Sequence, residues 1–131
     1  MAAIIVDIDD TLLRNGTQPI RSTIDWINEK AKDYTIIIVT GRPESTRERT
    51  VRALRDAGVR YSRLVMNTGS TRESNQFKAV AARRIKTQTR VAVAIDNDEG
   101  ARNAYRSAGI KTASPTSLGE TTLKFNMFWR L

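Results

Sequence analysis

The chain has 131 residues with no cysteine and no histidine, and its 22 Lys and Arg against 14 Asp and Glu give a formal net charge of +8. This composition excludes disulfide frameworks, cysteine- or histidine-dependent catalysis, Ser-His-Asp hydrolases and zinc sites with histidine ligands. Any catalysis must therefore depend on carboxylates, Lys, Arg or hydroxyl groups, and a hard cation such as Mg²⁺ fits that set best.

The length predicts one domain over residues 1–131, with its motif-bearing core at about 4–113 and a tail at 114–131. No apolar run is long enough to cross a membrane, and the chain does not start with the layout of a secretory signal. We expect a cytoplasmic protein without a membrane partner. The basic surface favours polyanions such as nucleic acid, although a merely solvated surface has the same composition.

The first strand is predicted at Ile4–Val6, a β-branched apolar run that leads into Asp7, Asp9 and Asp10. Carboxylates this close together repel one another and are costly to bury. An acidic turn explains one or two of them, but three beside a buried strand favour a bound cation or a shared proton.

The rest of the chain alternates between predicted helices and strands. A helix begins at about Ile20, and another, with Pro43 in its first turn and a capping box from Ser45 to Glu48, runs to Gly58. Two more helices are predicted at about 77–85 and 99–108, after a polar loop at 67–75. Further strands are predicted at 35–39, 64–66, 91–95 and 110–113. The aromatic residues of the tail are interpreted as packing residues.

Continuous apolar strands alternating with helices predict an α/β fold, a three-layer Rossmann-like domain with a mostly parallel central sheet. Ligands of such sheets bind beyond the carboxyl ends of the strands. Asp7 and Asp9 follow the first strand, Thr40 the second and Asp96 the fourth. We therefore expect these side chains to share one pocket.

Four segments resemble, in order, the motifs of the haloacid-dehalogenase (HAD) phosphatase superfamily: DxDxT at residues 7–11, TIIIVTGRP, FKAVAARRI and AIDNDEGARNAYRSAGI. They are most similar to the branch that contains the 3′-phosphatase domain of phage polynucleotide kinase and related small phosphatases. The similarity spans about residues 4–110. The resemblance implies a Mg²⁺-dependent phosphomonoesterase, and it leaves open a separate kinase or ligase partner.

The resemblance also implies a role for each residue. Asp7 would attack phosphorus to form an aspartyl-phosphate, and Asp9 would act as general acid and then general base. Asp7, the Asp9 backbone carbonyl and Asp96 would hold Mg²⁺. Thr40, the Gly41 N–H and Lys78 would bind the phosphoryl oxygens.

Several of these residues have alternative interpretations. Thr40 could cap a helix, and Lys78 by itself could be a solvated helix residue. Arg42 could bind phosphate, which we favour, or pair with Glu44. Asp10 is interpreted as a solvent-facing turn residue. The other arginines of the second helix are expected on an exposed face.

The fourth motif departs from the branch, which usually has two adjacent aspartates where this chain has Asp96-Asn97. Asn97 could still orient a metal-bound water, so we expect altered metal affinity rather than lost activity. Asp98 could instead supply the outer carboxylate. Arg14 matches only approximately the branch's arginine after the first motif, which weakens the substrate assignment.

The spacing of the motifs leaves no room for an inserted cap domain, so the site should be open to the end of a polymer. The leading hypothesis is hydrolysis of polynucleotide 3′-phosphate ends. The alternatives are a HAD phosphatase of nucleotides or other small metabolites, and a non-catalytic nucleic-acid-binding module.

Overall fold

The computed structural model describes residues 1–69 and 73–118. Within these ranges, five strands form the main sheet in the order β5–β4–β1–β6–β7, and all four neighbouring pairs are parallel. The strands are β1 (Ala3–Val6), β4 (Thr35–Pro43), β5 (Arg63–Asn67), β6 (Val91–Ile95) and β7 (Thr112–Ala113). The predicted α/β class with a mostly parallel sheet is confirmed.

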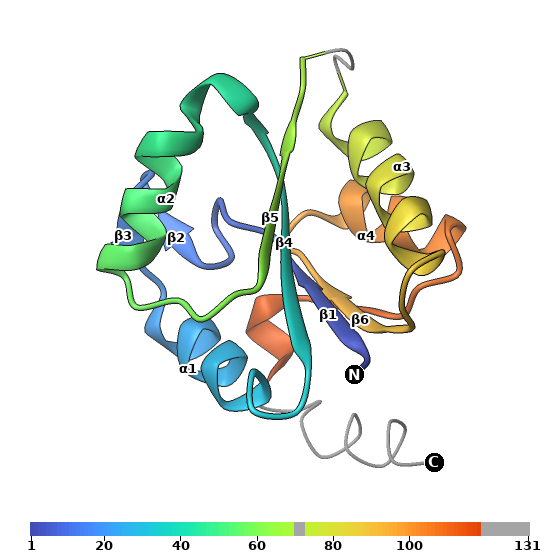
Figure 1. The fold of residues 1–131 in the computed structure, drawn as a ribbon, viewed down its shortest axis with the longest axis horizontal. Coiled ribbons are helices and arrows are strands. Elements are labelled where there is room, and N and C mark those ends of the chain that lie inside the picture. Colours follow the sequence, from blue (N-terminus) through green and yellow to red (C-terminus); the bar gives the residue numbers. More distant parts are fainter. Residues whose placement is uncertain (70–72, 119–131) are drawn as a thin grey trace.

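Four α-helices of the described ranges cover the sheet: α1 (Arg21–Lys30), α2 (Arg47–Asp56), α3 (Ser74–Lys86) and α4 (Glu99–Ser107). Helices α1 and α2 lie on one face and α3 and α4 on the other, which makes the three layers visible in Figure 1. The predicted strands and helices thus all exist, with bounds that differ by a few residues.

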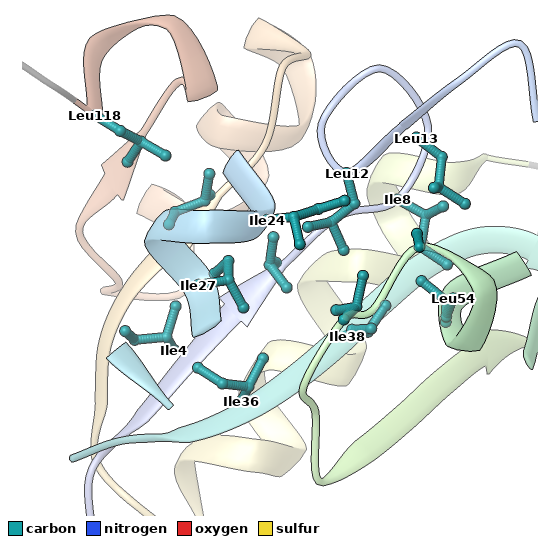
Figure 2. Packing of buried hydrophobic residues seen from close by; sticks show 14 of the residues in the cluster. Ile4, Ile8, Leu12, Leu13, Ile24, Ile27, Ile36, Ile38, Leu54 and Leu118 are labelled. Atoms are coloured by element: carbon teal, nitrogen blue, oxygen red, sulfur yellow. The ribbon is translucent and has the colours of Figure 1, made fainter. Parts of the chain in front are cut away.

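Alternate side chains of each strand enter the two cores, because successive residues of a strand point to opposite faces. Ile4 and Val6 of β1 join a cluster with Ile24 and Ile27 of α1, shown in part in Figure 2. Ile5, one residue along, joins the other cluster, which includes Ala81, Ala82 and Ile85 of α3. Both faces are apolar, which is why the central strands are continuous apolar runs.

The segment predicted as a polar turn contains a small antiparallel hairpin, β2 (Leu13–Arg14) and β3 (Gln18–Pro19). Asn15 and Gly16 have positive φ values of 52° and 85°, as a tight hairpin loop requires. The hairpin lies between β1 and α1 in the chain, and it stands beside the carboxyl end of β1.

The start of α2 differs from the prediction. Strand β4 continues to Pro43, and a 3₁₀ turn, η1 (Glu44–Thr46), precedes the helix. The predicted capping box of Ser45 and Glu48 is therefore wrong, because Thr46 is the N-cap residue and its side chain makes no capping hydrogen bond. Its hydroxyl donates instead to the Pro43 carbonyl at 2.8 Å.

Strand β7 is followed by a second 3₁₀ turn, η2 (Pro115–Ser117), and Leu118 packs against the first core. The predicted aromatic packing of the tail lies outside the described residues. Within the described ranges no helix is both long and apolar enough to cross a membrane.

Candidate active site

Three charged side chains meet below the carboxyl edge of the sheet. Lys78 donates from Nζ to Asp7 Oδ1 at 3.0 Å and to Asp96 Oδ2 at 2.7 Å. All three are buried, with side chains no more than 6% exposed. Asp7 follows β1, Asp96 follows the neighbouring β6, and Lys78 comes from α3, so the parallel sheet is what brings them together.

The buried cluster of Asp7, Lys78 and Asp96 contains one cation for two carboxylates. Burial, and then the charge of Asp96, raise the pKa of Asp7 from 3.8 to about 7, although Lys78 partly opposes this. Burial lowers the pKa of Lys78, but the carboxylates of Asp7 and Asp96 outweigh it and hold that pKa above its usual value. The ionised cluster therefore has an excess of negative charge in a poorly solvated place, which an additional cation would balance.

Asn97 and Thr11 complete the surroundings of Asp7. The Thr11 hydroxyl lies 3.2 Å from Asp7 Oδ2 and accepts the Asn97 backbone N–H at 3.1 Å. The Asn97 side chain makes hydrogen bonds with its neighbours when its amide nitrogen points toward them. In that orientation it donates to the Asp9 carbonyl at 2.9 Å and to Asp7 Oδ2 at 3.2 Å. A carboxylate oxygen and a main-chain carbonyl oxygen thus converge on one donor.

This oxygen set fits a hard divalent cation. Oxygen ligands are those that Mg²⁺ prefers, and the buried excess of negative charge favours it further. Among the described residues, no three acidic side chains gather closely enough to hold a metal ion. The predicted ligand set is compatible with that finding, because it uses the Asp9 backbone carbonyl and not its carboxylate. A bound cation would compete with the Asn97 amide nitrogen for two oxygens, the Asp9 carbonyl oxygen and Asp7 Oδ2.

The Asp9 carboxylate points to a different partner, Arg42. Arg42 Nη2 lies 2.8 Å from Asp9 Oδ1 and Nε lies 3.1 Å from Oδ2, so the pair is bidentate. The Arg42 guanidinium also donates to the Gly16 carbonyl at 3.1 Å and the Thr50 hydroxyl at 3.3 Å. All three of its nitrogens are engaged, and the alternative of a pair with Glu44 is wrong, because Glu44 pairs with Arg47.

The phosphate-binding residues predicted from sequence lie along β4 and α3. A cavity of about 440 Å³ opens at this edge, and Asp7, Asp9, Gly41 and Lys78 are among the residues that line it. Thr40 is completely buried, and its hydroxyl accepts the Arg42 backbone N–H at 3.1 Å. Thr40 does not cap α2, because the N-cap residue of that helix is Thr46. The hydrogen bond from the Arg42 N–H to Thr40 closes a turn before the helix begins.

Gly41 must be glycine for a packing reason. A Cβ atom added there would lie 2.2 Å from the Ser74 side-chain oxygen at the start of α3. Ser74 and its neighbour Asn75 also line the cavity, and sequence reasoning missed both. They belong to the predicted polar loop, where no motif distinguishes them from other polar loop residues.

Asp10 and Asp98 have structural roles. Asp10 is exposed and has a positive φ of 61°, which confirms a turn residue that faces solvent. Asp98 is the N-cap residue of α4, and its carboxylate accepts the Ala101 N–H at 2.8 Å. Asp98 also lines the cavity, so its role as the outer carboxylate stays a prediction.

A family profile described as haloacid dehalogenase-like hydrolase matches residues 4–102. The chain belongs to this family. The match covers every residue of the candidate site. It confirms the resemblance inferred from the four motifs, and it makes the chain a member of a hydrolase family.

Solved structures share the fold at low identity. A chain of the Pnkp1/Rnl/Hen1 RNA repair complex aligns with a TM-score of 0.75 at 23% identity, covering 86% of this chain and 42% of that one. The protein SP0104 from Streptococcus pneumoniae, a haloacid dehalogenase-like hydrolase, aligns at 0.64 with 13% identity, covering 86% and 83%. This chain spans less than half the length of the first of these. No curated protein matches the chain by sequence.

Proposed function

We propose that this chain is a Mg²⁺-dependent phosphomonoester hydrolase that works through an aspartyl-phosphate on Asp7 and acts on the 3′-phosphate ends of polynucleotides. The observation that carries the proposal is the buried cluster of Asp7, Lys78 and Asp96 at the edge of an open cavity. A purely structural role would not require two buried carboxylates to share one lysine, because apolar residues in their place stabilise a core at least as well.

The first half-reaction transfers the phosphoryl group to the protein. An Asp7 carboxylate oxygen attacks phosphorus, and the bond from phosphorus to the leaving oxygen breaks. Asp9 gives its proton to that oxygen, so that an alcohol leaves. Lys78 and the backbone N–H of Gly41 balance the charge on the phosphoryl oxygens. In the structure Arg42 holds the Asp9 carboxylate at the mouth of the cavity, so this pair must open before Asp9 takes up the proton that it gives to the leaving oxygen.

The second half-reaction returns the protein to its starting state. Asp9, now a carboxylate, takes a proton from water as the water oxygen attacks phosphorus. The bond between phosphorus and Asp7 breaks, and inorganic phosphate leaves. Mg²⁺, bound by Asp7, the Asp9 carbonyl and Asp96, would cancel the repulsion between the carboxylate and the phosphate.

The openness of the site supports a polymer end as the substrate. Only residues 68–73 separate β5 from α3, and the hairpin is all that stands between β1 and α1, so neither connection holds a cap domain. The side chain of Asp9 is 54% exposed, which leaves the general acid accessible to a large leaving group. The formal charge of +8 also favours a polyanion. The RNA repair complex that contains the structurally similar chain agrees with a nucleic-acid substrate.

Phosphate release from a panel of substrates tests the proposal. The panel contains 3′- and 5′-phosphorylated oligonucleotides, mononucleotides and phenyl phosphate, each with Mg²⁺ and with EDTA. We expect Mg²⁺-dependent release that is fastest on 3′-phosphorylated oligonucleotides, and a preference over mononucleotides that falls as salt rises. Equal rates on mononucleotides and oligonucleotides at every salt concentration would favour a small-metabolite phosphatase instead. Full release in EDTA would exclude the role of the metal.

A further inference from the structure

A second cavity, of about 420 Å³, lies next to the catalytic one, and Asp9 and Arg42 are among its lining residues. Asp9 lines the catalytic cavity as well, so its carboxylate stands at the boundary between the two. The walls of the second cavity come from the β2–β3 hairpin, through Gly16 and Thr17, and from η1 and α2. No step of the proposed hydrolysis uses this space.

The position of Asp9 determines what this second cavity can receive. The general acid must contact the oxygen that leaves phosphorus, so the leaving alcohol lies beside Asp9. The phosphoryl group occupies the side of Asp7 and Lys78, and the remainder of the leaving group must therefore extend past Asp9 in the other direction. That direction leads to the second cavity, whose volume is in the range of small-molecule sites and suits one nucleotide unit.

The lining of the second cavity suits a phosphorylated ligand. Arg49, on α2, is exposed, and its side chain makes no hydrogen bond or ion pair with any residue that the structure describes. Arg42, by contrast, is already occupied by Asp9, Gly16 and Thr50. The hydroxyls of Thr46 and Thr50 lie in the same wall, but the Thr46 hydroxyl donates to the Pro43 carbonyl and Thr50 is buried and accepts from Arg42. Arg49 is thus a guanidinium that can pair with a phosphodiester without breaking an existing bond.

We propose that this second cavity is the subsite for the leaving group, where it binds the terminal nucleotide unit, with Arg49 paired to the phosphodiester on the 5′ side of that unit. The inference rests on the proposed function, and it adds the part of the substrate that the catalytic cavity does not reach. It explains how an uncapped site distinguishes a polymer end from a small phosphoester. Arg42 would then act as a positioning residue between the two cavities.

Kinetics on three substrates test the leaving-group subsite. A 3′-phosphorylated dinucleotide carries the phosphodiester that Arg49 would bind, a nucleoside 3′-monophosphate lacks it, and phenyl phosphate also lacks the nucleoside. For Arg49→Gln we expect KM for the dinucleotide to rise about 5- to 10-fold, with kcat little changed and both other substrates unaffected. The dependence of log kcat/KM on log salt should lose a slope of about 1, as for one lost phosphate contact.

Arg52→Gln is the matched control, because Arg52 is also an exposed arginine of α2 but pairs with Glu48 and does not line the second cavity. It removes the same charge and should leave all three substrates unchanged. A readout without turnover is the anisotropy of a labelled oligonucleotide with a 3′-hydroxyl end, which we expect to bind about 5- to 10-fold more weakly to Arg49→Gln only.

The possible results separate the two proposals. If the unaltered protein hydrolyses none of the substrates, both the proposed function and the subsite fall. If it hydrolyses them but Arg49→Gln and Arg52→Gln behave alike, or Arg49→Gln slows phenyl phosphate as much as the dinucleotide, only the subsite is overturned. A selective effect of Arg49→Gln on the dinucleotide supports the subsite.

Discussion

Two clusters of ion-paired side chains lie at the same edge of the sheet, and they differ in how much solvent surrounds them. In the buried cluster, Lys78 faces both Asp7 and Asp96, and the three side chains are at most 6% exposed. In the outer pair, Arg42 faces Asp9 one to one, and the Asp9 side chain is 54% exposed. The buried cluster has an excess carboxylate and little water around it, whereas the outer pair is balanced and partly solvated.

This difference assigns different tasks to similar residues. Buried charges cost several kcal/mol unless they are compensated, so the inner cluster is suited to hold a cation and to react. The outer pair is solvated on its Asp9 side, so breaking and remaking it costs less than disturbing the buried cluster. A carboxylate that must give a proton and take one back is better placed in the second environment. Changes in the inner cluster should therefore have larger effects than changes in the outer pair.

The largest effect is expected for Asp7→Asn, which removes the proposed nucleophile. Phosphate release should fall at least about 10⁴-fold, since an amide oxygen does not attack phosphorus at a useful rate. Asp33→Asn is the matched control, because Asp33 is also an aspartate but is exposed and does not line the catalytic cavity. It should retain activity. A phosphate-release assay beside a circular dichroism spectrum checks both variants, and full activity of Asp7→Asn excludes the covalent route.

Lys78→Met should be the most destabilising change in the cluster, because it leaves Asp7 and Asp96 buried without their shared cation. We expect the metal-free protein to lose about 3–5 kcal/mol of unfolding free energy at pH 8, and the activity to fall about 10²- to 10³-fold. Mg²⁺ should restore part of the stability. Lys86→Met on the same helix, which loses one hydrogen bond to the Ala108 carbonyl, should cost only about 1 kcal/mol. Urea titrations with and without Mg²⁺ measure these values, and equal losses in the two variants would contradict the account.

The difference in stability between Asp7→Asn and the unaltered protein should depend on pH in a defined direction. The pKa of Asp7 is raised from 3.8 to about 7, so the folded state holds this proton more tightly than the unfolded state. The cost of the charged carboxylate is full above pH 7, falls as pH drops through about 7 and disappears below 3.8. We expect the metal-free variant to be more stable than the unaltered protein by about 2 kcal/mol at pH 8, and by nearly nothing at pH 4. A stability difference that grows towards acid would contradict the burial of an ionised Asp7.

The smallest effect concerns Asn97, whose amide nitrogen faces the Asp9 carbonyl and Asp7 Oδ2. Asn97→Asp replaces this competing donor by a carboxylate, so Mg²⁺ should bind about 10-fold more tightly, which corresponds to about 1.4 kcal/mol. Asn103→Asp adds the same charge on the exposed side of α4 and should leave the affinity unchanged. Isothermal titration calorimetry measures both, and weaker binding to Asn97→Asp would show that the amide is not in competition with the ion.

The main elements follow from local sequence. The apolar runs around Ile5, Ile37 and Val93 can only be buried strands, and the acids that follow two of them are placed at one edge by parallel pairing. Lys78 was assigned only through the order of the motifs, since nothing local distinguishes a buried lysine from a solvated one. The structure places it between the carboxylates of Asp7 and Asp96.

Other features depend on contacts between distant residues and could not be predicted. The bond of Arg42 to Asp9 joins residues 33 positions apart, and it was neither the phosphate contact that we favoured nor the alternative pair with Glu44. The β2–β3 hairpin was missed because the residues on either side of its Asn-Gly turn do not alternate between apolar and polar, which is the usual sequence signal of a hairpin. Ser74 is recognisable only once α3 has brought it against Gly41.

The most direct measurement of the central claim is the location of the phosphoryl group during turnover. The protein is mixed with a 3′-phosphorylated oligonucleotide and Mg²⁺, quenched in acid within the first turnover and digested for mass spectrometry. We expect one phosphoryl group on Asp7. In Asp9→Asn the first half-reaction lacks its acid and the second lacks its base, so the phosphoryl group should form more slowly and persist longer. A phosphoryl group on any other residue, or none on a protein that releases phosphate, would contradict it.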